Sequence, residues 1–202
     1  IMKILEIKKL NFPQVKVIRY QKFADERGYF TETFRQSDLQ PNLLENFSVK
    51  QINESYSKAN VFRGLHLQYQ PAMSKMIRIL EGEIVDFFID IRPASKTFGQ
   101  INGYHLKAQK KYPWGEWIFI PSGFAHGVLF LKEGKIEYLC DASWNPEGEL
   151  AVNIFDKNIS WSFADERIKK IFAERKNKLI LSEKDKKGVS LEEAKNILRS
   201  IL

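Results

Sequence analysis

The sequence predicts a mainly β domain, an antiparallel sandwich or barrel, that ends in a short helical tail. From about residue 12 to residue 162, short segments alternate apolar with polar residues, as strands with one buried face do. Gly, Pro or Asn stands between many of these segments, and many evenly spaced short strands are typical of sandwiches and barrels. The chain also holds 15 Phe, 7 Tyr and 4 Trp, an aromatic content more usual in sheets than in helical bundles.

The composition predicts one compact domain over residues 1–202, with a β core at about 12–162 and a helical tail at 163–202. The single cysteine, Cys140, excludes an intramolecular disulfide and fits a reducing cytoplasm. The N-terminal residues lack the apolar run of a signal peptide, and no segment approaches the ~20 apolar residues of a membrane span. We therefore expect a soluble cytoplasmic protein that does not contact a membrane.

The formal net charge of +7 does not by itself identify a partner. Much of the basic excess lies in the tail, in KKIFAERKNK and EKDKKG, where acidic residues are interleaved as on a solvated helix face. The chain has no zinc-finger spacing, RRM-type aromatic motif or helix-turn-helix pattern. We expect no nucleic-acid partner.

The first elements are read directly from the pattern. VKVIRYQKF (15–23) predicts a strand, ERG a turn, and YFTETF (29–34) a half-exposed strand. SDLQPNLLENF (37–47) predicts a short helix with Ser37 as its N-cap.

The strands that follow are separated by turn residues. We expect hairpin turns at EGE (81–83) and KEGK (132–135). The segments predicted as strands are FSVKQINESYS, FRGLHLQ, KMIRILEG, EIVDFFIDIR, GQINGYHLK, EWIFIPSG, AHGVLFLKEG and KIEYLCDASW.

The tail changes to a helical period. ADERIKKIFAERKN (164–177) predicts one helix, and Ser190 with Glu193 forms a capping-box signature at the start of a second. The apolar stripe of the second helix is expected to be a packing face; it consists of Leu191, Ala194, Ile197, Leu198 and Ile201.

Histidine is scarce, with three in the chain, and two lie in motifs that attract attention. His66 stands in VFRGLHLQYQP, where the simplest interpretation is a hydrogen-bonded core histidine. His126 stands in IPSGFAHG, and this PxGxxH spacing resembles half of the signature of cupins, which are double-sheet jelly rolls (double-stranded β-helices).

Cupins often bind a metal through two histidines and a glutamate near HxH, together with the later histidine. Here the first half reads His66-x-Gln68, and residues 69–74 contain no glutamate. Lys75 stands near the expected carboxylate, and a lysine there repels a divalent cation and favours an anion. We expect no metal site, and a metal-dependent cupin oxygenase is the least favoured alternative.

Five motifs, in order and between residues 12 and 186, resemble dTDP-4-dehydrorhamnose 3,5-epimerases. They are FADERGYFTETF, QINESYS with FRGLH, DIRPASKTFG, IPSGFAHG and LILSEKD. The resemblance implies a cupin-like jelly-roll homodimer that uses neither metal nor organic cofactor. Its implied partner is a nucleotide-diphosphate sugar, a 4-keto-6-deoxyhexose that the enzyme inverts at C3, C5 or both.

The resemblance also implies catalytic roles. Protons on C3 and C5, which flank the C4 ketone, become removable if the enolate is stabilised, and a neutral imidazole is a suitable base. By this resemblance His66 is that base and Asp185 of LSEKD orients it. Lys75 would stabilise charge on the C4 oxygen, and Tyr138 of EYLC would deliver a proton to the opposite face.

Binding residues are implied in the same way. Arg63 and Arg27 match diphosphate contacts, for which a guanidinium is well suited. Positions that match base contacts or other pocket contacts are Phe30, Glu32, Gln51, Asn53 and His126. Arg63 and His66 are three residues apart, so an ideal strand would direct them to opposite faces. Both reach one ligand if Gly64 forms a bulge or if the groove is open.

Two features depart from the family pattern: Trp144 stands where a tyrosine is frequent, and the segment between Trp161 and LSEKD is longer than usual. Both fit a changed nucleotide, a changed sugar or the loss of one epimerisation. The alternatives are a C3-only epimerase or 3,4-ketoisomerase on the same scaffold, and a non-catalytic jelly-roll sugar-binding protein. The set of His66, Lys75, Tyr138 and Asp185 favours the epimerase.

Overall fold

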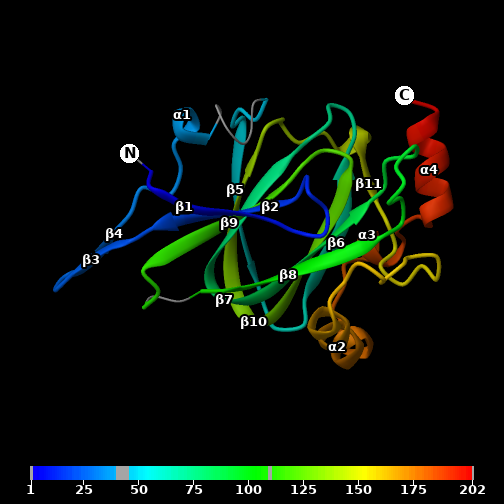
Figure 1. The fold of residues 1–202 in the computed structure, drawn as a ribbon. Coiled ribbons are helices and arrows are strands. Elements are labelled where there is room, and N and C mark those ends of the chain that lie inside the picture. Colours follow the sequence, from blue (N-terminus) through cyan, green and yellow to red (C-terminus); the bar gives the residue numbers. More distant parts are fainter. Residues whose placement is uncertain (1, 40–45, 109–110, 202) are drawn as a thin grey trace.

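The computed structural model describes residues 2–39, 46–108 and 111–201, and its main element is a strongly bent antiparallel sheet with two halves (Figure 1). Two long strands, β7 (Lys75–Asp90) and β10 (Phe124–Cys140), pair along their length and belong to both halves. The first half adds β1 (Ile4–Lys9), β2 (Lys16–Gln21), β9 (Trp114–Ile120) and β5 (Gln51–Ser57). The second half adds β8 (Ile101–Lys107), β6 (Phe62–Gln68) and β11 (Glu149–Ala151). The predicted mainly β jelly roll is confirmed.

The two predicted hairpin turns, EGE and KEGK, are wrong, because both lie inside the long strands where these pass from one half to the other. A Cβ added to Gly82 would lie 2.4 Å from the Glu133 carbonyl oxygen, and one added to Gly134 would lie 2.0 Å from that of Glu81. The pairing register also shifts between Lys132 and Lys135. The glycines therefore permit close backbone approach at a bend, a use of glycine that a short pattern does not distinguish from a turn.

The N-terminal third differs from the prediction in its details. β3 (Phe23–Asp25) and β4 (Gly28–Phe30) form a small arm that extends from the body, and Thr31–Phe34 are not a strand (Figure 1). Helix α1 (Gln36–Leu39) contains Ser37, so Ser37 is not its N-cap: the first turn already closes with the Asp38 amide donating to the Arg35 carbonyl. Residues 40–45 of the predicted helix lie outside the described residues.

The helical tail agrees with the prediction. Helix α2 (Glu166–Arg175) is capped by Asp165, and α4 (Leu191–Arg199) has the predicted capping box of Ser190 and Glu193. Between them lie a short 3₁₀ turn, η2 (Lys176–Lys178), and helix α3 (Glu183–Lys186); a further 3₁₀ turn, η1 (Pro146–Gly148), precedes β11.

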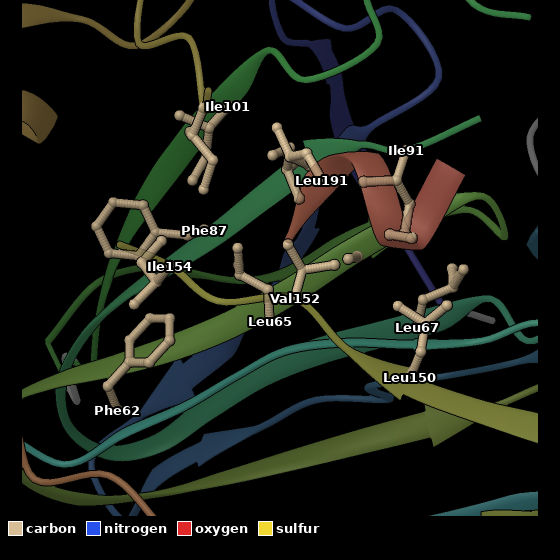
Figure 2. Packing of buried hydrophobic residues seen from close by; sticks show 14 of the residues in the cluster. Phe62, Leu65, Leu67, Phe87, Ile91, Ile101, Leu150, Val152, Ile154 and Leu191 are labelled. Atoms are coloured by element: carbon tan, nitrogen blue, oxygen red, sulfur yellow. The ribbon is translucent and has the colours of Figure 1, made fainter. Parts of the chain in front are cut away.

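The apolar face of α4 packs on the second half of the sheet. Leu191 belongs to the same buried cluster as Leu65 and Val152 (Figure 2). Ala194 and Leu198 are also buried, whereas Ile201 is 44% exposed and does not belong to the packing face. No helix among the described residues is long and apolar enough to span a bilayer.

Strands β1 and β11 were not predicted. Leu5 and Ile7 of β1 are exposed, so this edge strand shows no alternation of buried and solvent-facing residues, and β11 has only three residues.

Candidate active site

A cavity of about 740 Å³ is lined by residues from both halves of the sheet and by the tail segment 180–185. The first half contributes Gln51, Asn53, Ser55, Lys75, Ile136, Tyr138 and Cys140, and the second Phe62, Arg63, His66, His126, Val128 and Glu149. β7 supplies Lys75, and β10 supplies residues from both halves, among them His126 and Tyr138, so the pairing of these two long strands brings the polar groups together.

His66 and Asp185 form a hydrogen-bonded pair in this cavity, with 2.6 Å between Nε2 and Oδ1. Burial raises the pKa of the Asp185 carboxyl, but the His66, Ser182 and Gly64 hydrogen bonds outweigh it and hold that pKa below its usual range. An ionised carboxylate only accepts hydrogen bonds, so Nε2 of His66 donates and Nδ1 carries the basic lone pair. The arrangement is that of an imidazole base with an orienting carboxylate.

The expected bulge is present at Gly64. His66 of β6 pairs with His126 of β10, and Arg63 pairs with Val128. Between these two pairs β6 advances by three residues and β10 by two, so β6 contains one extra residue. Gly64 has φ +139°, and a Cβ there would lie 2.3 Å from Cα of Gly127. The bulge lets Arg63 and His66 line the same cavity, and its amide donates to Asp185. Arg63 is held by Ser57, whose Oγ lies 2.9 Å from its Nε.

A second polar chain runs from Lys75 through His126 to Asp86. Nζ of Lys75 lies 3.2 Å from Nε2 of His126, whose Nδ1 lies 3.2 Å from Oδ1 of Asp86. Burial lowers the pKa of His126 and Lys75 lowers it further, while Asp86 opposes both, so the ring is held neutral. With Nδ1–H donated to Asp86, Nε2 accepts from Lys75, which keeps its other N–H bonds for the cavity. Burial also lowers the pKa of Lys75, against the attraction of Cys140, Glu149 and Asp86.

Tyr138 and Cys140 lie on the same strand as His126, in the part of β10 that belongs to the first half. Burial raises the pKa of the Tyr138 phenol, so it is protonated at neutral pH and can act as a donor. Burial likewise raises the pKa of the Cys140 thiol, which accepts a hydrogen bond from Asn53.

The sequence analysis missed three charged residues of the site. Asp86 was assigned no role, yet it is fully buried and Oδ2 has no hydrogen-bond partner within the described residues. Glu149 and Lys184 line the cavity and form an ion pair. Burial raises the pKa of Glu149, but Lys184, His66 and Lys75 outweigh it and lower that pKa below its usual range. Lys184 could have been predicted as a site residue, because it directly precedes Asp185 in the LSEKD motif.

Three predicted binding residues lie away from the cavity, on the arm and just after it. The Arg27 side chain is 85% exposed and pairs with Asp25, Phe30 is 74% exposed, and Glu32 pairs with Arg35. None of the three lines the cavity of its own chain.

The other predicted binding positions do line the cavity. Gln51 accepts a hydrogen bond from the backbone amide of Trp144 at 2.8 Å and donates to Asn53 at 2.9 Å. This contact holds Trp144, which is 57% exposed, at the side of the cavity. An aromatic face and adjacent amide groups are suited to a nucleobase.

Gln68, at the position of the second cupin histidine, is directed elsewhere. Its side-chain amide donates to the backbone carbonyls of Pro71 and Ser143 and accepts from the backbone amide of Asn145. It therefore stabilises the loops around residues 71 and 143–145. In the described ranges, no three His, Cys, Asp or Glu side chains converge as metal ligands.

The fold and the cavity define a class: jelly-roll proteins with a carboxylate-oriented histidine, a buried lysine and a tyrosine around one cavity. The sequence profile of dTDP-4-dehydrorhamnose 3,5-epimerase matches residues 9–193, and the chain belongs to that family.

Three relatives illustrate the similarity. The dTDP-4-dehydrorhamnose 3,5-epimerase of Methanothermobacter thermautotrophicus is 39% identical over 150 residues, which are 74% of this chain and 75% of the relative. That of Neisseria gonorrhoeae is 39% identical over 138 residues, 68% of this chain but only 40% of the relative. The Legionella pneumophila RmlC structure, a dTDP-6-deoxy-D-glucose-3,5-epimerase in complex with dTDP-4-keto-L-rhamnose, has a TM-score of 0.79 and 30% identity, covering 93% of each chain.

Proposed function

We propose that this protein epimerises a nucleotide-linked 4-keto-6-deoxyhexose, of the dTDP-4-dehydro-6-deoxyglucose type, at C3 and C5 without a metal or organic cofactor. The observation that carries the proposal is the His66–Asp185 pair, which shares one cavity with Lys75 and Tyr138. Family membership and the dTDP-4-keto-L-rhamnose bound to the Legionella relative support the same substrate class.

In the proposed reaction, Nδ1 of His66 takes the proton from C3 or C5, and the electron pair of the C–H bond moves onto the C4 oxygen. Asp185 stabilises the imidazolium that forms. Lys75 donates a hydrogen bond to the C4 oxygen and stabilises the enolate, while its contact with His126 fixes its direction. Tyr138 then donates a proton to the carbon from the opposite face, which inverts the centre.

The same proposal assigns binding. Arg63, oriented by Ser57 at the edge of the bulge, would contact the diphosphate. Gln51, Asn53 and Trp144 would hold the pyrimidine by amide hydrogen bonds and stacking.

The test is incubation with dTDP-4-keto-6-deoxyglucose in deuterated water, followed by NMR. Deuterium at both C3 and C5, with inversion, is the expected result. Deuterium at C3 alone identifies a C3-only epimerase, and transfer of the keto group identifies a 3,4-ketoisomerase. No exchange with measurable dTDP-sugar binding identifies a sugar-binding protein and rejects the proposal.

The exposed arm supports a homodimer. The arm of β3 and β4 extends from the body (Figure 1). It leaves three large apolar residues exposed, Phe23, Tyr29 and Phe30, and none of them lines the chain's own cavity. We propose a two-fold interface burying more than roughly 1,600 Å², in which Arg27, Phe30 and Glu32 complete the nucleotide site of the neighbouring subunit.

Mixed dimers test this exchange. Homodimers of the His66→Asn variant and homodimers of the Phe30→Ala variant should each have little or no activity. If arms act between subunits, refolding the two variants together restores activity, because one pocket then has both an intact His66 and an intact arm. An active monomer at micromolar concentration by sedimentation, or no restoration on mixing, contradicts the proposal.

We also propose that the enzyme acts in the cytoplasm. There it would help to produce the dTDP-rhamnose that is used in lipopolysaccharide biosynthesis. The buried unpaired thiol of Cys140 is compatible with that compartment. Cell fractionation with an antibody to the protein tests the location.

A further inference from the structure

Helix α2 contacts β8 and lies outside the strands of the sheet (Figure 1). Near its start, Arg167 donates to Nδ1 of His105 at 2.7 Å. Ile168 is buried, and the Phe172 ring stacks on Trp161 with 4.7 Å between centroids. These contacts fix the helix as a rigid body, so its last residue, Arg175, has a defined position.

Arg175 connects this helix to the turn that precedes the His66 strand. Its Nη1 donates to Oδ1 of Asn60 at 2.7 Å. Asn60 has φ +66°, a left-handed conformation that Asn and Gly tolerate best, and its amide donates to the Phe130 carbonyl at 2.8 Å. The turn is therefore held on one side by β10 and on the other by α2.

The backbone returns to this turn five residues after Arg175, at Ile180. The Ile180 amide donates to the Asn60 carbonyl at 2.9 Å, and the Phe62 amide donates to the Ile180 carbonyl at 3.0 Å. At the other end of the segment, Val189 donates to Ala151 at 2.8 Å, beside β11. Asp185 lies between these two attachments, in helix α3.

We propose that α2 is a positioning element for the His66–Asp185 pair, with Arg175 acting through Asn60 to fix where the Asp185 segment joins the His66 strand. Neither residue contacts the cavity, so both are positioning residues. The kinetic part of this inference rests on the proposed epimerase function.

The matched pair of variants is Arg175→Met and Arg167→Met, at opposite ends of one helix. Arg175→Met should lower the maximal rate of deuterium incorporation by about tenfold with little change in KM, since small misplacements of catalytic groups are costly. Arg167→Met removes one contact, with His105, while buried Ile168 and the Phe172–Trp161 stack still hold the helix, so its rate should remain near wild type. Asn60→Gly suits the left-handed backbone, removes the acceptor, and should reproduce the Arg175→Met loss. Arg175→Lys with Asn60→Asp restores a charged contact and should recover most of the rate.

NMR of histidine labelled with ¹⁵N provides a readout that does not need turnover. The Nε2–H proton of His66, held by Asp185, should exchange with water faster in Arg175→Met and Asn60→Gly than in wild type or Arg167→Met. Unchanged exchange and an unchanged rate in both variants overturn the inference. If the wild type incorporates no deuterium, the proposed function fails, and the Nε2–H measurement still decides the positioning role.

Discussion

Nε2 of His66 lies 2.6 Å from Oδ1 of Asp185, although 119 residues separate them in the chain. His66 belongs to the β core and Asp185 to the helical tail, so the base is oriented only once the tail has docked. The direction of the hydrogen bond determines the tautomer and leaves Nδ1 as the base.

Asp185→Asn is expected to lower the rate of deuterium incorporation by about 10² to 10⁴, because an amide no longer fixes the tautomer or stabilises the imidazolium. The NMR exchange assay measures it. Glu183→Gln is the control, since this neighbouring acid is exposed and pairs with Lys186. A rate within twofold of wild type for Asp185→Asn would contradict the orienting role.

Arg63→Ala is expected to weaken dTDP binding by about 1.5 to 3 kcal/mol, the usual worth of a charged hydrogen bond, with a smaller effect on the maximal rate. A phosphate contact made equally in ground and transition states acts mainly on affinity. Isothermal titration with dTDP measures the loss. Ser57→Ala, which keeps the charge but removes the 2.9 Å contact that orients Arg63, should lose less. Unchanged affinity in Arg63→Ala would remove Arg63 from the diphosphate site.

Local patterns were sufficient for much of the fold. Alternation predicted the strands with one buried face, and the helical pattern of residues 164–177 predicted α2. The capping box predicted the start of α4, because it is a contact between residues three apart. The errors arose where one signal has two physical meanings. Gly82 and Gly134 read as turns, but they allow two long strands to approach each other closely.

The site was predicted where it follows motifs and missed where it depends on pairing across the sheet. His66 and Asp185 lie in motifs that resemble one family, Lys75 and Tyr138 were assigned by the same resemblance, and all four line the cavity. Asp86 lies in an apolar strand, and His126, whose Nδ1 lies 3.2 Å from its Oδ1, is 40 residues away in the chain. Sequence alone gives the polarity of such a residue but not which residue it faces.

Gly64→Ala is expected to lower the free energy of unfolding by about 3 kcal/mol or more. The added Cβ meets the backbone of Gly127 at 2.3 Å, where no side chain can move aside. Gly28→Ala is a matched control: φ is +135° there, but nothing lies within 4 Å of the added Cβ. The difference between the two variants in urea denaturation isolates the steric contact from the backbone conformation. Equal losses would show that the close approach of β6 and β10 is not required.

Lys75→Met is expected to change how stability depends on pH. Burial lowers the pKa of Lys75 below its ordinary value of 10.5, so between these two values the unfolded chain binds more protons than the folded one. Stability of the wild type therefore rises with pH across that window, and methionine, which does not titrate, removes this contribution.

Urea denaturation of both proteins from neutral to alkaline pH measures this difference. The stability of Lys75→Met relative to wild type should be highest at the lower end of the window and fall as the pH approaches 10.5. Lys178→Met, at an exposed lysine, controls for loss of a charge. A difference that is constant with pH would show that Lys75 is not desolvated in the folded state. The variant should be inactive whatever its stability, since the enolate loses its donor.

The last prediction separates base from acid. His66→Asn removes the group that takes the proton, so deuterium should not enter at C3 or C5, a loss of about 10² to 10⁴ in rate. Tyr138→Phe keeps the His66–Asp185 pair and removes only the phenol, whose pKa burial raises. Proton removal should then continue, and solvent exchange with retention should persist at one carbon while inverted product falls sharply.

An NMR time course in deuterated water, with saturating substrate, follows both variants. The expectation depends on the placement of His66 on β6 and Tyr138 on β10, whose side chains line one cavity from the two halves of the sheet. Exchange in His66→Asn equal to that of wild type would remove this histidine from the mechanism. Identical loss of exchange in both variants would mean that Tyr138 is needed for proton removal itself, and the division into one base and one acid would be wrong.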